Sequence, residues 1–323
     1  MTPLLGIHHV SAIARDPERS VAFYAGTLGL RLVKQTVNFD DRSTYHFYFG
    51  DAHATPGSLM TIFPMPRARQ GVPGTGQVGV TAFAITPAAV PFWSERLRTL
   101  GVAHDGPQSR TFGGHTEQVI ALRDPDGLYL ELVAHAGAAS RPGSGGSSEI
   151  PSPLAIRGLH GVTLWLDRRE RTEQMMVDTL GFRFVAEHDG VRRFEAGAGG
   201  VSTFVDLHVR ADLAYGKNGA GTAHHVAFRV ANAADEAAVG EALLGAGRRV
   251  TEMKDRKYFQ SIYSREPGGV LFEYATDQPG LTVDETLPEL GQVLQLPTHF
   301  EPLRSEIVVH LPPVAAIRTE RVA

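Results

Sequence analysis

The sequence predicts an α+β protein built from four βαβββ modules, followed by a C-terminal helical tail. Three observations support this fold class. Gly6–Val33 aligns with Gly158–Val185 without a gap, which indicates an internal duplication. The quarters between these segments also resemble each other, and each quarter places a strand-like segment before a helix-like one. A chain of 323 residues is long enough for two domains or several fused modules with large cores.

The first and third modules begin with the duplicated segment. Each copy opens with alternating apolar and polar residues, as in a strand, and continues into an amphipathic helix. The helix is expected to end at Leu-Gly, where glycine suits the C-cap position, and a new strand follows. The two copies read GIHHVSAIARDPERSVAFYAGTLGLRLV and GLHGVTLWLDRRERTEQMMVDTLGFRFV.

The second and fourth modules match each other in the same order of elements. Each has a predicted strand, a helix-like middle and a final segment in which Arg-acid-Pro-x-Gly marks a turn before an apolar run and a glutamate. The paired segments are Val80–Ile85 with His225–Val230, Pro87–Gly101 with Ala233–Gly247, and Gln118–Leu132 with Gln260–Tyr274.

A stretch rich in glycine, serine and proline separates the two halves of the chain. It reads AGAASRPGSGGSSEIPSP, has no apolar periodicity and predicts a linker. In the tail, short helices are expected around Leu287–Leu294 and Pro302–Leu311, and we expect the tail to pack against the modules without contributing chemistry. The expected segments are an N-terminal domain at 1–135, the linker at 136–153, a C-terminal domain at 154–275 and an extension at 276–323.

The composition is that of a globular protein without nucleic-acid or membrane features. Apolar residues make up 42 % and charged residues 20 %, and the net charge is −4, with no basic stripe. The first residues lack the features of a signal peptide and no apolar run is long enough to span a membrane, so we expect a cytoplasmic protein. Cysteine is absent, so a bound metal would need imidazole and carboxylate ligands, which suit iron, manganese, zinc, nickel or copper.

Three side chains on predicted strands form the set that a facial metal site needs. They are His9 in the first module, with His225 and Glu273 in the fourth. The duplication supplies an internal control, because the other copy retains only the glutamate and could not hold a metal. The counterparts are Gly161, Val80 and Glu131.

Two of the histidines belong to His-His dipeptides, and strand alternation separates the members of each dipeptide. On a regular strand His8 faces away from His9, and His224 faces away from His225. His8 also has a counterpart in His160, which is consistent with a role in the repeated structure. We therefore expect His9 and His225 to be the ligands, and His8 and His224 to make no direct contact with the site.

Two histidines and one carboxylate on one face of an octahedral ion leave up to three positions open. That arrangement is typical of non-haem Fe(II) oxygenases, and the same ligands could hold zinc with an open position. Tyr263 and Arg256 precede Glu273 and could supply a hydroxyl and a fixed cation to a bound phenolate. The alternative is that Arg256 is a surface cation and Tyr263 a core aromatic.

Several motifs make the sequence resemble the vicinal oxygen chelate (glyoxalase/extradiol dioxygenase) superfamily. Within it, the chain is similar to ring-cleaving dioxygenases of the hydroquinone 1,2-dioxygenase type, over nearly its whole length. The motifs are LGIHHV at Leu5–Val10, YHFYFGDAHATPGSLMTIFP at Tyr45–Pro64, AHHVAF at Ala223–Phe228, the Asp255–Glu273 segment, and GQVLQLPTHFEPLRSEIVVHLPP at Gly291–Pro313.

The resemblance implies two vicinal oxygen chelate domains and an Fe(II) enzyme of aromatic catabolism that uses dioxygen. Ligands from the first and fourth modules match the hydroquinone group, whereas the catechol-cleaving enzymes use the third and fourth modules. The implied substrate is a small hydroquinone that binds iron through one deprotonated oxygen, with Mn, Zn or Ni as other metals. The implied site comprises the ligands His9, His225 and Glu273, with Ser11, Arg256 and Tyr263 near the substrate, and His8 and His224 as further candidates; Tyr263 or a histidine would handle the proton.

Two other functions remain open from the sequence. A glyoxalase-like isomerase or lyase using Zn, Ni or Mn would be fully active without oxygen. A protein that only binds an aromatic ligand would show no turnover and would tolerate Glu273→Gln. Whether the chain forms a homo-oligomer is also open.

Overall fold

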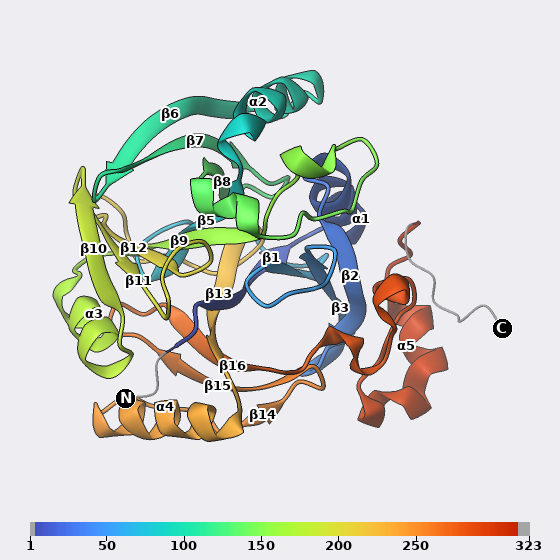
Figure 1. The fold of residues 1–323 in the computed structure, drawn as a ribbon. Helices are drawn as coiled ribbons and strands as arrows, with labels where there is room; N and C mark the ends of the chain where they lie inside the picture. The colour runs from blue at the N-terminus through green and yellow to red at the C-terminus, as the bar shows by residue number, and fades with distance from the viewer. Residues whose placement is uncertain (1–3, 316–323) are drawn as a thin grey trace.

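The computed structural model describes residues 4–315, which form two curled eight-stranded sheets with helices around them (Figure 1). In the first sheet the strand order is β2-β3-β4-β1-β13-β16-β15-β14, and in the second it is β10-β11-β12-β9-β5-β8-β7-β6. We call these sheets the first cup and the second cup. Residues 1–3 and 316–323, at the ends of the expected first and last segments, lie outside the described residues.

The bounds of the elements are as follows. The first cup contains β1 (Ile7–Ala14), β2 (Arg31–Asn38), β3 (Asp41–Gly50), β4 (Leu59–Pro64), β13 (Thr222–Val230), β14 (Lys254–Asp255), β15 (Phe259–Arg265) and β16 (Leu271–Pro279). The second contains β5 (Gln77–Ile85), β6 (His104–Phe112), β7 (His115–Arg123), β8 (Tyr129–Ala134), β9 (Leu159–Leu166), β10 (Arg183–His188), β11 (Val191–Glu195) and β12 (Phe204–Val209). The α-helices are α1 (Pro17–Val21), α2 (Val90–Thr99), α3 (Glu170–Gln174), α4 (Ala233–Gly245) and α5 (Arg304–His310).

The four-module α+β fold is confirmed, and each cup combines one module from each half of the chain. The first cup joins modules one and four, and the second joins modules two and three. In both cups two antiparallel central strands, β1 with β13 and β9 with β5, connect the modules. Each sheet contains strands from both halves of the chain, so the sheets do not show a domain boundary within residues 136–153. That boundary stays a prediction.

The helices expected within the four modules are present, with one difference in kind. In both copies of the duplicated segment the α-helix continues as a π-helical turn, at Ala22–Thr27 after α1 and at Met175–Thr179 after α3. Gly29 and Gly181 follow with φ of +65° and +73°, so glycine supplies the left-handed conformation at each helix end. Equivalent deviations in both copies indicate that the π-turn belongs to the repeat.

The tail, which includes α5, packs against β2 and β3 (Figure 1). The helix expected around Leu287–Leu294 is mostly wrong, since only Leu287–Glu289 forms a 3-10 turn and Leu294 bridges to Gln35 of β2. Hydrogen bonding to a strand holds this segment extended, because the Gln35 side-chain amide donates to the Gly291 carbonyl. The helix expected around Pro302–Leu311 is present as α5 and the 3-10 turn before it.

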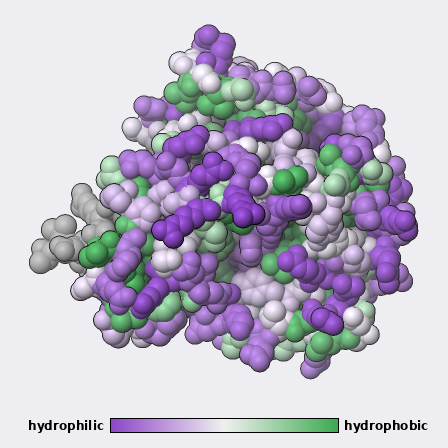
Figure 2. Space-filling model, turned by 180° about the vertical axis from the view of Figure 1, so that it is seen from behind, coloured by the Kyte–Doolittle hydropathy of each residue, from purple (hydrophilic) through white to green (hydrophobic). Residues whose placement is uncertain are grey.

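Hydrophilic residues cover most of the face shown in Figure 2, and hydrophobic residues occur there in small, separate groups. Within residues 4–315, no helix combines the length and apolar character needed to cross a bilayer.

Glu236 is a buried carboxyl in α4, and it makes the stability of the protein depend on pH. It is 4 % exposed and its Oε1 has no hydrogen-bond partner among the described residues. Burial, together with the charge of Glu273, raises its pKa from 4.5 to about 7. Between these values the folded protein binds more protons than the unfolded chain, so stability falls as pH rises from about 4.5 through 7.

We therefore expect Glu236→Gln to stabilise the protein at pH 8 by on the order of 1 kcal/mol and to have little effect at pH 4.5. Urea unfolding at several pH values checks this, with the exposed Glu241→Gln on the same helix as the control. Parallel pH profiles for Glu236→Gln and the parent protein would contradict it.

Candidate metal site

Both His-His dipeptides lie at β-bulges, and this places the two members of each pair side by side. The ladder between β1 and β13 shifts by one residue at His8 and again at His224, so each is an extra residue opposite its partner strand. His8 Nδ1 lies 2.9 Å from His9 Nδ1, and His224 Nδ1 lies 2.7 Å from His225 Nδ1. The expectation that strand alternation separates them is wrong, because a bulge interrupts the alternation.

The three predicted ligands converge in the first cup. His9 comes from β1, His225 from β13 and Glu273 from β16, and all three are buried. The two Nε2 atoms lie 3.2 Å apart, and Glu273 Oε2 lies 3.1 Å from His9 Nε2 and 2.8 Å from His225 Nε2. Ligand atoms on one face of an octahedral ion, each about 2.1 Å from it, are roughly 3.0 Å apart, against roughly 3.4 Å for a tetrahedral ion. The spacing fits a facial octahedral set.

Hydrogen bonds on the far side of each ligand leave its inner atom free for a metal. Tyr263 donates its hydroxyl proton to Glu273 Oε1 at 2.6 Å, and within residues 4–315 Oε2 takes part in no regular hydrogen bond. If His9 and His225 donate from Nδ1 to the preceding histidines, their Nε2 lone pairs and Oε2 meet at one point. Three converging lone pairs repel one another unless a cation lies between them, so the arrangement fits a bound metal.

The protonation states also suit metal binding. Burial lowers the pKa of His225, which keeps its imidazole neutral. Burial opposes ionisation of Glu273, yet positive charge on the adjacent rings of His9 and His225 holds the pKa of its carboxyl well below the usual range, and a bound cation would act in the same direction. Burial raises the pKa of Tyr263, so its hydroxyl remains a proton donor. A neutral imidazole and an ionised carboxylate are the forms that bind metal.

A cavity of about 390 Å³ opens onto the three ligands, within the size range of small-molecule sites. Its walls are largely aromatic and apolar, and polar side chains stand at intervals among them. The apolar lining residues are Phe39, Tyr48, Phe63, Met65, Phe259 and Leu271, and the polar ones include Asn38, Asp40, His46, Thr251 and Lys254. A planar aromatic ligand fits such a lining.

The structure brings most of the predicted site residues to this cavity. Arg256, Tyr263 and His224 line it together with the ligands. The Arg256 Nε donates to the Tyr263 oxygen at 3.4 Å, and its Nη1 donates to Asp40 at 3.0 Å. The alternatives of a surface cation and a core aromatic therefore do not describe these two side chains.

The remaining two predicted residues lie behind the cavity lining. Ser11 is fully buried and hydrogen-bonds Thr61 at 2.7 Å, and Thr61 in turn contacts His46 at 2.9 Å. His8 contacts His9 and the ring of Phe259. His8 therefore lies one contact behind the lining, and Ser11 lies two contacts behind it, through Thr61 and His46.

His46 and Phe259 are lining residues that the sequence reasoning passed over. His46 stacks on Phe63 with ring centroids 4.1 Å apart, and burial lowers its pKa. Phe259 packs on His9 with centroids 5.4 Å apart. Alternation of His46 with Tyr48 on β3 was the available signal for the first, and proximity in sequence to Arg256 for the second.

The second cup contains the equivalent positions, filled differently. Strand register confirms the equivalence: Ser11 pairs with His225 as Thr163 pairs with Val80. Where the first cup has its three ligands, the second has Gly161, Val80 and Glu131, and Glu131 accepts an ion pair from Arg110 at 2.8 Å. The bulges recur too, at Gly79 and His160.

Comparisons with known proteins agree with this site. Residues 6–132 match the model of the "Glyoxalase/Bleomycin resistance protein/Dioxygenase superfamily". The chain is 40 % identical over 303 residues to "Putative ring-cleaving dioxygenase MhqO" of Bacillus subtilis (strain 168), covering 94 % of each chain. It is 31 % identical over 312 residues to the chlorohydroquinone/hydroquinone 1,2-dioxygenase of Sphingobium indicum, again covering 94 % of each.

Solved structures show the same fold. The crystal structure of a "putative dioxygenase" from Bacillus subtilis superposes with a TM-score of 0.90 at 38 % identity, covering 99 % of this chain and 100 % of that one. Glyoxalase I from Zea mays superposes with a TM-score of 0.62 at 16 % identity, over 84 % of this chain and 92 % of that one, which shows a shared fold alone.

Proposed function

Because the chain belongs to the glyoxalase/bleomycin resistance protein/dioxygenase superfamily and, within it, to the ring-cleaving dioxygenases, we propose that it opens the ring of a hydroquinone with dioxygen at an Fe(II) ion. His9, His225 and Glu273 would hold the ion. The observation that carries the proposal is the convergence of these three atoms at octahedral spacing, at the base of an aromatic-lined cavity.

Bound Fe(II) would supply the one-electron chemistry that allows dioxygen to react with an organic substrate, which side chains alone do not provide. The chain would supply binding and orientation. The aromatic walls would hold the substrate ring flat, and Arg256 would stabilise the substrate oxygen in its deprotonated form. The ring would open between a hydroxylated carbon and its neighbour, with both oxygen atoms of dioxygen in the product.

The two dipeptide histidines that do not hold iron would have different tasks. His8 would fix the ring orientation and tautomer of His9 from behind, and its own ring is hydrogen-bonded to the Thr276 backbone. His224 would do the same for His225, but it also lines the cavity. Burial lowers the pKa of His224 to about 4, which keeps its imidazole neutral. Its Nε2 would exchange a proton with the substrate as part of that neutral ring.

Anaerobic loading with Fe(II), followed by oxygen uptake with hydroquinones and catechols, tests the proposal. We expect one dioxygen consumed per hydroquinone and much slower uptake with catechols. A glyoxalase-like isomerase would instead be active without oxygen, and a protein that only binds aromatics would show no turnover. No uptake with any phenol, despite a filled metal site, would refute the dioxygenase proposal.

Tyr263→Phe is expected to lower the affinity for Fe(II) by about 10- to 100-fold, because it removes the donor that orients Glu273. Competition with a chelator measures this affinity. Tyr129→Phe is the matched control, since that hydroxyl meets Arg123 in the second cup and not a ligand. Equal affinities for the two variants would mean that Tyr263 does not orient the carboxylate.

A further inference from the structure

A tight turn connects two residues of the cavity wall, Arg256 and Phe259. The Tyr258 N–H donates to the Arg256 carbonyl at 2.7 Å, which closes a γ-turn, and Lys257 at its centre has φ +64°. A side-chain-bearing residue rarely adopts this conformation, and such strain persists only where the surroundings enforce it. The direction of the Arg256 side chain therefore depends on whatever holds Lys257 and Tyr258.

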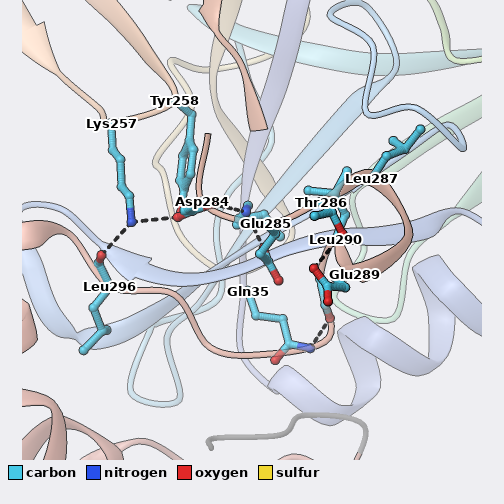
Figure 3. A network of polar contacts seen from close by, with 12 residues as sticks. Gln35, Lys257, Tyr258, Asp284, Glu285, Thr286, Leu287, Glu289, Leu290 and Leu296 are labelled. Atoms are coloured by element: carbon cyan, nitrogen blue, oxygen red, sulfur yellow. Dashed lines mark hydrogen bonds and ion pairs between the residues drawn. The ribbon is translucent and has the colours of Figure 1, made fainter. Parts of the chain in front are cut away.

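The C-terminal extension supplies that support through one carboxylate. Asp284 forms an ion pair with Lys257 Nζ at 2.6 Å and accepts a hydrogen bond from the Tyr258 hydroxyl at 3.0 Å (Figure 3). It also forms an ion pair with Lys34 Nζ at 2.6 Å. Lys257 Nζ also donates to the Leu296 carbonyl at 3.0 Å. The turn is thus fastened on two sides by residues 281–296, which we call the C-terminal strap.

The strap is itself anchored in the first cup. Lys34 on β2 is fully buried, and its ammonium contacts both Asp284 and Glu285, so the charges of these two carboxylates balance those of Lys34 and Lys257. An unpaired buried charge is costly, so moving the strap away from the turn would be unfavourable because it would separate these lysines from their carboxylates.

Tyr258 transmits the position of the strap to the cavity wall. Its ring packs edge-to-face against Tyr48 and Phe39, with centroids 6.1 and 6.3 Å away, and both of these residues line the cavity. Arg256 and Phe259 on either side of the turn also line it. Movement of this turn would displace one wall of the cavity while leaving the three ligands on their strands.

We propose that the C-terminal strap is part of the active site, and that Asp284 is a positioning residue that holds Arg256 where it meets the deprotonated substrate oxygen. This role differs from the expectation that the tail contributes no chemistry. It rests on the proposed function only in assigning Arg256 to the substrate oxygen. The test below measures binding without turnover, so it can fail or succeed independently of ring cleavage.

The probe is 4-nitrophenol, a para-substituted phenol whose absorbance distinguishes phenol from phenolate. With the Fe(II)-loaded protein under anaerobic conditions, Asp284→Asn is expected to weaken phenolate binding about 10-fold and to raise the pH at which the bound phenol ionises. Asp284→Glu should restore much of the loss. Glu301→Gln, which breaks the Glu301–Arg304 pair elsewhere in the extension, is the control and should change binding less than about 2-fold.

A double-mutant cycle separates positioning from a general loss of stability. If Asp284 acts through Arg256, then Asp284→Asn should have almost no further effect on phenolate binding in an Arg256→Gln background. Tyr258→Phe, which removes a single donor to Asp284, repeats the cycle if Asp284→Asn folds poorly. An equal loss of binding in both backgrounds would overturn the proposal, as would unchanged binding in Asp284→Asn.

Discussion

Replacing His9 by alanine is expected to abolish Fe(II) binding and dioxygen uptake, whereas replacing His8, its immediate neighbour, should leave the metal in place. His9 Nε2 is one of three atoms that meet at a spacing of about 3 Å, and two remaining ligands would not retain iron against water. His8 meets the Nδ1 of His9, on the far side of the ring from the ligand atom Nε2. Its loss should weaken metal affinity by about 10- to 100-fold, the usual range for groups that orient a ligand.

Iron content after anaerobic loading and desalting measures the difference, with circular dichroism to confirm that each variant folds. His224→Ala and His225→Ala form a second matched pair at the other bulge, and His225→Ala should lose the metal while His224→Ala keeps it. Full iron content in His9→Ala, or loss of iron in His8→Ala at saturating Fe(II), would reverse the assignment of ligand and support.

The ligand set could be predicted from the sequence because the chain carries its own comparison. Glu273 has a glutamate counterpart in Glu131, whereas the counterparts of the two histidine ligands are Gly161 and Val80, and the strand register places these residues at equivalent points. Such a comparison needs no knowledge of the three-dimensional arrangement, since it depends only on the duplicated sequence pattern.

The roles of His8 and His224 could not be predicted by the same means. A bulge adds one residue to one strand of a ladder, and here it is defined by the register of two strands that lie far apart in the sequence. Neither dipeptide carries a glycine or proline that would signal the irregularity. Strand alternation does not hold across these two positions, and nothing in the local sequence shows this.

The pairing of modules and the contribution of the tail depend on contacts between segments distant in the sequence. Lys34 and Asp284 meet across 250 positions of the chain, and no local pattern links them. A lysine within the apolar strand segment LVKQTV was the one available signal, since a fully buried lysine needs a carboxylate partner. The sequence gives no indication of which carboxylate that is.

The second cup shows what occupies the place of a metal site that has no ligands. Glu117 stands where the first cup has Phe259, and it accepts ion pairs from Arg193 at 2.7 Å and Arg110 at 3.1 Å. His160 lies 2.9 Å from the same carboxylate, and burial lowers the pKa of this histidine to about 4. Charged side chains thus fill the interior that the first cup keeps open for a ligand.

Glu117→Gln is therefore expected to destabilise the protein by about 2–3 kcal/mol, because each of two arginines loses one of its two carboxylate partners, Arg193 keeping Asp206 and Arg110 keeping Glu131. Glu117 is 1 % exposed, so water cannot replace the lost charge. The same substitution at Glu95, whose ion pair with Arg98 is exposed, should cost less than about 1 kcal/mol.

Urea unfolding of the two variants measures this contrast, and iron content per folded molecule should remain the same in both. If Glu117→Gln unfolds at the same urea concentration as Glu95→Gln, the buried cluster is not what stabilises the second cup. If it unfolds earlier and also loses iron while still folded, the two cups are coupled. We expect Glu117→Gln to unfold at a lower urea concentration and to retain its iron, because the three ligands stand on β1, β13 and β16 of the first cup, whereas Glu117 stands on β7 of the second.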